Sequence, residues 1–158
     1  MRVPKIYLET TVFNYYFDTD RDAHTDTVKL FDEIKAGKYE VFTSIYVMDE
    51  LAKAGEPKRS NMLELIEKYD IIVVPADEET EKLADIYISE KVIPTSKQLD
   101  SLHIACASVN DVDYIFSFNF RHINRIKTKE MTSIINIREG YKPVKITVPA
   151  EVIEYDES

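Results

Sequence analysis

Short apolar segments alternate with longer segments of helical periodicity along most of the chain. The apolar segments are rich in Ile, Val, Tyr and Phe, and they are Lys5–Thr10, Glu40–Ser44, Tyr69–Val74 and Asp113–Ser117. Most of them lack the polar–apolar alternation of a strand with one wet face, as strands of a parallel sheet covered on both faces do. The pattern therefore predicts an α/β fold with a central, mainly parallel sheet flanked by helices.

Helical patterns fill the intervals between these strands, as the crossovers of a parallel sheet require. The predicted helices are Thr25–Ala36, Ile45–Lys53, Lys58–Lys68, Glu78–Glu90 and Ser96–Val109. Ser44 is a suitable N-cap for the second helix, and Thr95 with Gln98 has the spacing of a capping box at the start of the last. Ligands of such folds bind beyond the carboxyl ends of the strands, so functional side chains are expected there.

The length and composition fit one domain. With 158 residues, of which 44% are hydrophobic, the chain can bury a core of its own. We expect one domain over residues 1–150 and an acidic tail over residues 151–158. The single cysteine, Cys106, excludes an internal disulfide and a cysteine-based zinc site, and no apolar stretch is long enough for a signal peptide or a membrane span. A cytoplasmic location without membrane contact is therefore expected.

The charge of the chain limits the kinds of partner. The net charge is −9, which does not favour tight non-specific binding to nucleic acid, and three glycines are too few to favour a Gly-rich phosphate loop. A nuclease remains open, because a bound metal ion changes the local sign of charge.

Acidic side chains fall at the carboxyl ends of the predicted strands. Glu9 ends the first strand and Glu50 lies in the helix after the second. Asp100 lies early in the helix before the fourth strand, and Asn119 follows that strand. Carboxylates that share a pocket need a proton or a cation between them, and oxygen ligands select hard ions such as Mg²⁺ or Mn²⁺. Such a site suits phosphodiester hydrolysis by a metal-activated water. The alternative is that some of the 29 acids lie at strand ends by chance, as surface charges.

Four motifs, in order, resemble those of the PIN-domain ribonucleases. They are Ile6–Thr11 (IYLETT), Val47–Leu51 (VMDEL), Asp100–Ala105 (DSLHIA) and Asp113–Phe120 (DYIFSFNF). The resemblance implies a three-layer α/β/α sandwich and a metal-dependent endoribonuclease that hydrolyses RNA. For the VapC-type toxins of this family it also implies an antitoxin partner and often a homodimer. The catalytic residues that it implies are Glu9, Glu50, Asp100 and Asn119, the first three as metal ligands.

This sequence departs from the family pattern at two positions. Glu9 stands where aspartate is usual, and its extra methylene moves the carboxylate outward, where a misplacement of about 1 Å is enough to impair catalysis. Asn119 stands where many relatives have aspartate, which removes one negative charge and should weaken metal binding. The alternative function is therefore a weak or inactive PIN-like module that binds RNA or protein.

Four polar side chains near the motifs are candidates for supporting roles. Thr10, Thr11 and Ser117 either hydrogen-bond a ligand or a carboxylate, or cap the helix that follows. His103, one turn after Asp100, either assists proton transfer near the site or is a packing residue.

The densest basic stretch of the chain follows the fourth motif. Its Arg121 and Arg125 are candidates for contact with an RNA backbone. The alternative is that they lie on a solvated face of a helix or loop.

Overall fold

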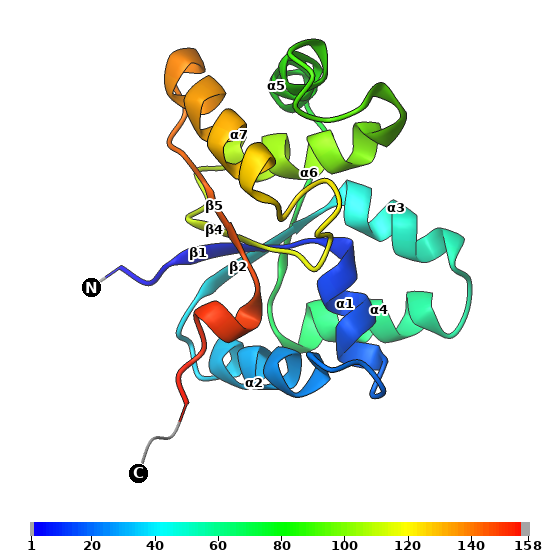
Figure 1. Ribbon diagram of the computed structural model, residues 1–158. Coiled ribbons are helices and arrows are strands. Elements are labelled where there is room, and N and C mark those ends of the chain that lie inside the picture. Colours follow the sequence, from blue (N-terminus) through cyan, green and yellow to red (C-terminus); the bar gives the residue numbers. More distant parts are fainter. Residues whose placement is uncertain (1, 156–158) are drawn as a thin grey trace.

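A parallel sheet with the strand order β3-β2-β1-β4-β5 forms the centre of the computed structural model, which describes residues 2–155 (Figure 1). The strands are β1 (Lys5–Leu8), β2 (Glu40–Ser44), β3 (Ile72–Val74), β4 (Tyr114–Phe116) and β5 (Lys145–Thr147). Every neighbouring pair is parallel, and Tyr7 of β1 lies between Phe42 of β2 and Ile115 of β4. The chain builds outward from β1 first to one side and then to the other. The topological switch point, where ligands bind in such sheets, therefore lies between β1 and β4.

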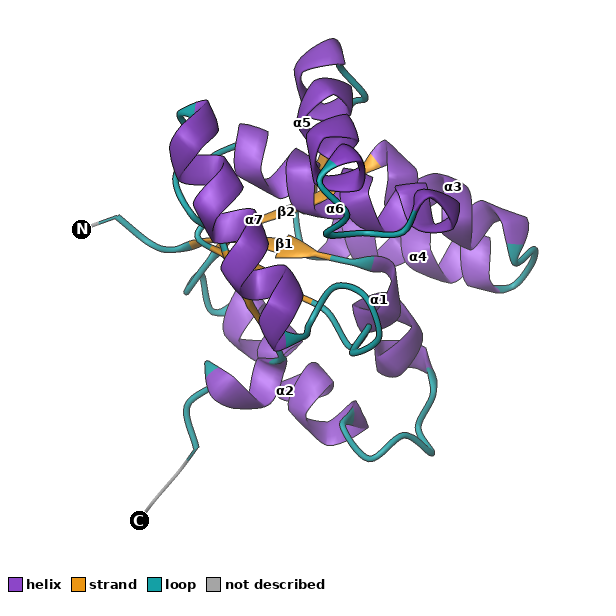
Figure 2. Cartoon of the chain, turned by 45° about the horizontal axis from the view of Figure 1, so that its top comes forward, coloured by secondary structure: helices purple, strands orange, loops and turns teal. Residues whose placement is uncertain are grey.

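Helices cover both faces of this sheet. They are α1 (Thr10–Phe17), α2 (His24–Lys35), α3 (Ile45–Lys53), α4 (Lys58–Lys68), α5 (Glu78–Ser89), α6 (Gln98–Val109) and α7 (Ile126–Glu139), with short 3-10 helices η1 (Thr95–Lys97) and η2 (Pro149–Glu151). Figures 1 and 2 show α5, α6 and α7 over one face and α1, α2 and α4 over the other. The predicted three-layer α/β/α sandwich is confirmed.

The core lies on both sides of β1. Ile6, Tyr7 and Leu8 are 0% exposed, which explains why this segment shows no polar–apolar alternation. Phe31 of α2 and Tyr87 of α5 are also fully buried, one from each layer of helices. Both faces of the sheet are therefore dry, and polar groups gather at the ends of the strands.

The helix starts test the predicted caps. Ser44 caps α3, because its hydroxyl accepts a hydrogen bond from the backbone N–H of Val47, and α3 and α4 have the predicted bounds. The predicted capping box is wrong. α6 begins at Gln98 after Lys97, which makes no side-chain cap, and Thr95 lies in η1.

The described end of the chain packs against α2. Ile153 is buried, and the carboxylate of Glu33 accepts hydrogen bonds from the backbone N–H of Glu154 at 2.8 Å and from the hydroxyl of Tyr39 at 2.7 Å. Of the predicted acidic tail, residues 151–155 lie on the domain and residues 156–158 fall outside the described part. Within residues 2–155, no helix combines the length and the apolar character that a membrane span needs.

Candidate active site

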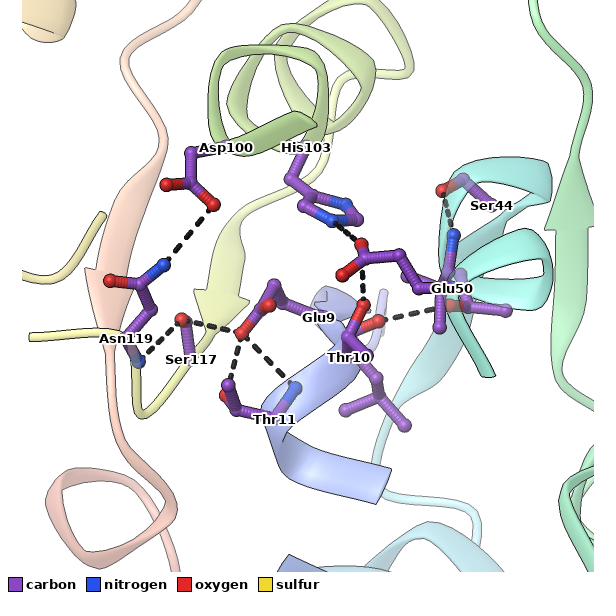
Figure 3. Close-up of polar contacts among 12 residues, drawn as sticks. Glu9, Thr10, Thr11, Ser44, Glu50, Asp100, His103, Ser117 and Asn119 are labelled. Atoms are coloured by element: carbon purple, nitrogen blue, oxygen red, sulfur yellow. Dashed lines mark hydrogen bonds and ion pairs between the residues drawn. The ribbon is translucent and has the colours of Figure 1, made fainter. Parts of the chain in front are cut away.

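Side chains from separate parts of the chain meet at the carboxyl ends of the strands, beside the switch point (Figure 3). Glu9 follows β1, Glu50 lies in the second turn of α3, and Asp100 lies in the first turn of α6. Ser117 and Asn119 follow β4. The topology thus brings the sequence-predicted acids to one place, as the switch-point rule leads one to expect.

Glu9 ends β1 by capping the next helix. The first strand stops at Leu8, two residues earlier than predicted, and Glu9 is the N-cap of α1 with its side chain accepting from the backbone N–H of Thr11. The same oxygen, Oε1, accepts from the hydroxyls of Thr11 at 2.6 Å and Ser117 at 2.7 Å. Glu9 is only 3% exposed, so these donors take the place of water around a buried charge.

Glu50 is held by a hydroxyl and an imidazole. Its Oε1 accepts from the hydroxyl of Thr10 at 2.9 Å and lies 2.7 Å from Nε2 of His103. Burial acts to raise the pKa of Glu50, but the hydrogen bond and the charge of His103, together with Thr10, lower the pKa of Glu50 below its ordinary value. Glu50 is therefore anionic at neutral pH.

His103 belongs to a buried polar chain that runs under the site. Its Nδ1 lies 2.8 Å from the hydroxyl of Tyr7, which lies 2.7 Å from the hydroxyl of Ser44. Burial acts to lower the pKa of His103, but Glu50, Glu9 and Asp100 raise the pKa of His103 above its ordinary value. The ring is 1% exposed and bonded at both nitrogens, so it orients Glu50 from behind.

Asp100 and Asn119 face each other across the opening. Nδ2 of Asn119 donates to Oδ1 of Asp100 at 3.1 Å, and Oδ1 of Asn119 accepts from the backbone N–H of His122 at 3.0 Å. Because a backbone N–H can only donate, the second contact fixes the amide with its N–H₂ toward Asp100. Asn119 thus offers Asp100 a donor, where an aspartate would offer a second negative oxygen.

Burial raises the pKa of Asp100, and the opposing effects of His103, His122 and Asn119 do not cancel it. Asp100 nevertheless lies in the first turn of α6, where the helix dipole favours a negative charge. A cation in front of this side chain would stabilise its ionised form further.

An open cavity of about 520 Å³ gives access to part of this arrangement. Its lining includes Glu50, Asp100 and Asn119 together with the basic side chains of Lys97 and Arg121. Glu9 lies deeper and is not part of the lining. Basic groups therefore border the acidic opening, as a site for a polyanion requires.

The donor set suits a hard divalent cation. Within residues 2–155, the hydrogen bonds to Glu9, Glu50 and Asp100 use one oxygen of each carboxylate, which leaves the second oxygen of each available. No three acidic, histidine or cysteine side chains of these residues lie close enough together to form a ready metal shell. Mg²⁺ commonly takes only one or two carboxylates and keeps several waters, so these carboxylate oxygens are suitable ligands for it without a complete protein shell.

Tyr7, Ser44 and Lys97 belong to the site and were not among the predicted site residues. Tyr7 could have been predicted, because a tyrosine within an apolar strand that is buried on both faces needs a hydrogen-bond partner for its hydroxyl. Of the predicted basic residues, Arg121 borders the acidic cavity and Arg125 lies in the lining of a neighbouring one.

Comparisons with known proteins bear on the family and the fold of this chain. A family model described as the PIN domain matches residues 6–129. The fold is similar to that of VapC20 from Mycobacterium tuberculosis, a sarcin-ricin loop cleaving toxin, with a TM-score of 0.56 and 15% identity over 74% of this chain and 92% of that chain. It is also similar to VapBC2 from Rickettsia felis bound to a DNA fragment from their promoter, with a TM-score of 0.55 and 16% identity over 77% of this chain and 92% of that chain. No curated protein sequence matches the chain.

Proposed function

We propose, since this chain belongs to the PIN-domain family, that it is an endoribonuclease that depends on Mg²⁺ or Mn²⁺. The observation that carries the proposal is that Glu9, Glu50 and Asp100 lie together at the switch point. Within residues 2–155, one carboxylate oxygen of each accepts no hydrogen bond. Three acids delivered by three separate elements to the ligand-binding edge of the sheet are difficult to explain as surface charge.

One or two of the three carboxylates would hold the cation directly and the others would act through its bound waters. The cation would orient the scissile phosphate and lower the pKa of an attacking water. Thr11 and Ser117 keep the buried Glu9 in one orientation. His103 does the same for Glu50. In this proposal the fixed orientations matter because hydrolysis needs its groups in place before the substrate arrives.

Arg121 is proposed to contact the RNA backbone. It borders the same cavity as Asp100, so its guanidinium can meet a phosphate that approaches the acids. RNA as the substrate also accounts for basic groups around an acidic opening in a chain with a net charge of −9.

We further propose that the chain is the toxin of a type II toxin–antitoxin pair and acts in the cytoplasm. Both structural neighbours support this, one being a sarcin-ricin loop cleaving toxin and the other VapBC2 bound to a DNA fragment from their promoter. An antitoxin partner and a homodimer are part of the proposal. The exposed isoleucines of α7, Ile126, Ile134 and Ile137, offer apolar surface for such contacts.

The test is cleavage of a structured RNA in the presence of Mn²⁺ by the wild type, by Asp100→Asn and by the control Asp85→Asn, which changes an exposed acid of α5. The proposal expects cleavage by the wild type and the control, and a loss of at least 100-fold in Asp100→Asn, because one removed stabilising group costs about 10²–10³ in rate. Equal cleavage by all three would identify a contaminant as the source and remove the assignment.

A PIN-like binding module without catalysis is the second candidate. It is favoured by the amide of Asn119, which turns a donor toward Asp100, and by the lack of a ready metal shell in residues 2–155. Calorimetry with Mn²⁺ separates the two functions. The absence of a heat of binding with millimolar Mn²⁺ would favour the binding module. Saturable Mn²⁺ binding that is lost in Asp100→Asn would favour the nuclease.

A further inference from the structure

A second cavity adjoins the candidate active site and has a different character. It measures about 220 Å³, and Lys91, Arg125 and Lys127 contribute to its lining. No carboxylate lines it, although the chain contains 29 acidic residues. The cavity thus concentrates positive charge on a protein whose net charge is −9.

The cations of this cavity are available to a ligand. Within the described residues, none of the three lies within 4.0 Å of a carboxylate oxygen, whereas Arg2, Lys142 and other cations of the chain form ion pairs. Among residues 2–155, the guanidinium of Arg125 donates one hydrogen bond, to the carbonyl oxygen of Arg121 at 3.4 Å. Close cations without counter-charges repel one another, and an anion between them removes that repulsion.

Hydrogen bonds hold the backbone of the wall between the two cavities. His122 lines both of them. Its backbone N–H donates to Asn119 at 3.0 Å, and its carbonyl accepts from the hydroxyl of Thr128 at 2.6 Å. One hydrogen-bonded loop therefore sets the position of the basic cavity relative to Asp100, to which Asn119 donates.

We propose that the Lys91–Arg125–Lys127 cavity binds a backbone phosphate of the RNA strand that neighbours the phosphate to be cleaved. This inference rests on the proposed ribonuclease function and extends it. A nucleic-acid strand carries phosphates at regular intervals, so a strand lying over His122 presents one phosphate to the acidic opening and another to the basic cavity. Phosphate contacts of this kind fix the register of a strand without reading its sequence.

The test removes charge from the cavity and compares the result with a matched removal nearby. The variant is Lys91→Gln with Lys127→Gln. The control is Lys82→Gln with Lys129→Gln, which removes two exposed lysines from α5 and α7 outside this cavity. Binding of a fluorescent single-stranded RNA of mixed sequence is measured in EDTA over a range of salt concentrations, so that the result depends neither on cleavage nor on a metal.

Each lost phosphate contact lowers the slope of log K against log salt by about 0.7 for a single strand. The cavity variant is expected to lose about 0.7 of slope and to bind about 5-fold more weakly at 0.1 M salt. In cleavage assays with Mn²⁺ its KM rises and its kcat stays near that of the wild type, because a contact to a phosphate that does not react binds the ground state and the transition state equally. Lys127→Arg keeps the slope of the wild type.

Two results distinguish this inference from the function on which it rests. A wild type that neither binds nor cleaves RNA would overturn the proposed function and this inference with it. A wild type that cleaves RNA, with a cavity variant indistinguishable from the control, would overturn the inference alone, and would leave the cavity to an acidic protein partner. The melting temperatures of the two double variants are expected to match. The single variant Lys127→Gln, which changes only α7, is expected to show about half of the loss of slope.

Discussion

Replacing Ser117 by alanine should destabilise the protein more than the loss of an ordinary buried hydroxyl. Ser117 is 0% exposed, donates to Oε1 of Glu9 at 2.7 Å and accepts from the backbone N–H of Asn119 at 3.0 Å. Its removal leaves Glu9 buried with Thr11 as the remaining neighbour that donates to it. The change deletes one oxygen and leaves almost no cavity, so its effect reports the hydrogen bonds.

The expected magnitude follows from the two lost contacts. A hydrogen bond to a charged group contributes about 1.5–3 kcal/mol and a neutral one about 0.5–1.5 kcal/mol. Ser117→Ala should therefore cost about 2–4 kcal/mol in the free energy of unfolding. For a domain of this size that lowers the melting temperature by about 4–16 °C.

The matched control is Thr43→Val. Thr43 is also 0% exposed at a strand end, and its hydroxyl donates to the carbonyl of Leu8 at 2.9 Å. The loss of this neutral contact should cost about 1 kcal/mol. Chemical denaturation of the wild type and both variants at pH 7 measures the difference. If Ser117→Ala costs no more than Thr43→Val, Ser117 does not stabilise a buried carboxylate and the account of Glu9 is wrong.

Three further changes test other parts of the structure. Burial acts to raise the pKa of Asp113, but Lys142 and other donors lower it. The stabilisation is therefore present above the ordinary carboxyl pKa and is lost as the pH falls through the lower pKa of the folded state. Denaturation curves should show that Asp113→Asn lowers the free energy of unfolding by about 0.5–1 kcal/mol at pH 7 and by almost nothing at pH 2. The hydroxyl of Tyr46 is buried without a partner among the described residues, so Tyr46→Phe should leave the melting temperature unchanged or raise it, and a fall would reveal a missed hydrogen bond. Asn119→Asp should lower the melting temperature in EDTA, because two carboxyl oxygens would then face each other where Asn119 now donates to Asp100, and should tighten Mn²⁺ binding in calorimetry. Unchanged or weaker Mn²⁺ affinity would exclude this side chain from the metal site.

Much of the fold was predictable because its central strands and several helices follow the expected hydrophobic patterns. β1 and β2 are apolar on both faces, and α3 and α4 have clear periodicity and natural ends. α7 was not predicted, and its burial shows why. It turns Thr128, Thr132 and Asn136 inward and exposes Ile134 and Ile137, so its apolar residues do not mark its buried face. β5 was not predicted either, because it has only three residues and lies at the edge of the sheet.

The sequence predicts where the residues of the candidate site lie, but not how each side chain is oriented. Strand ends in a parallel sheet gather at one edge, so the positions of Glu9, Glu50 and Asp100 follow from the topology. The orientation of the Asn119 amide does not, because it depends on the backbone N–H of His122 in the folded loop. No local pattern in the sequence records such a contact, and this contact decides whether Asp100 faces a donor or a second negative charge.

The most direct test of the account is a crystal structure of the protein soaked in Mn²⁺, with anomalous scattering used to locate the ion. The account predicts one strong peak in the opening between Glu9, Glu50 and Asp100, at about 2.0–2.3 Å from an oxygen of at least one of them. It also predicts that the peak disappears in Asp100→Asn. An ion bound elsewhere on the protein, or none at a saturating concentration, would contradict the claim that these acids form a metal site.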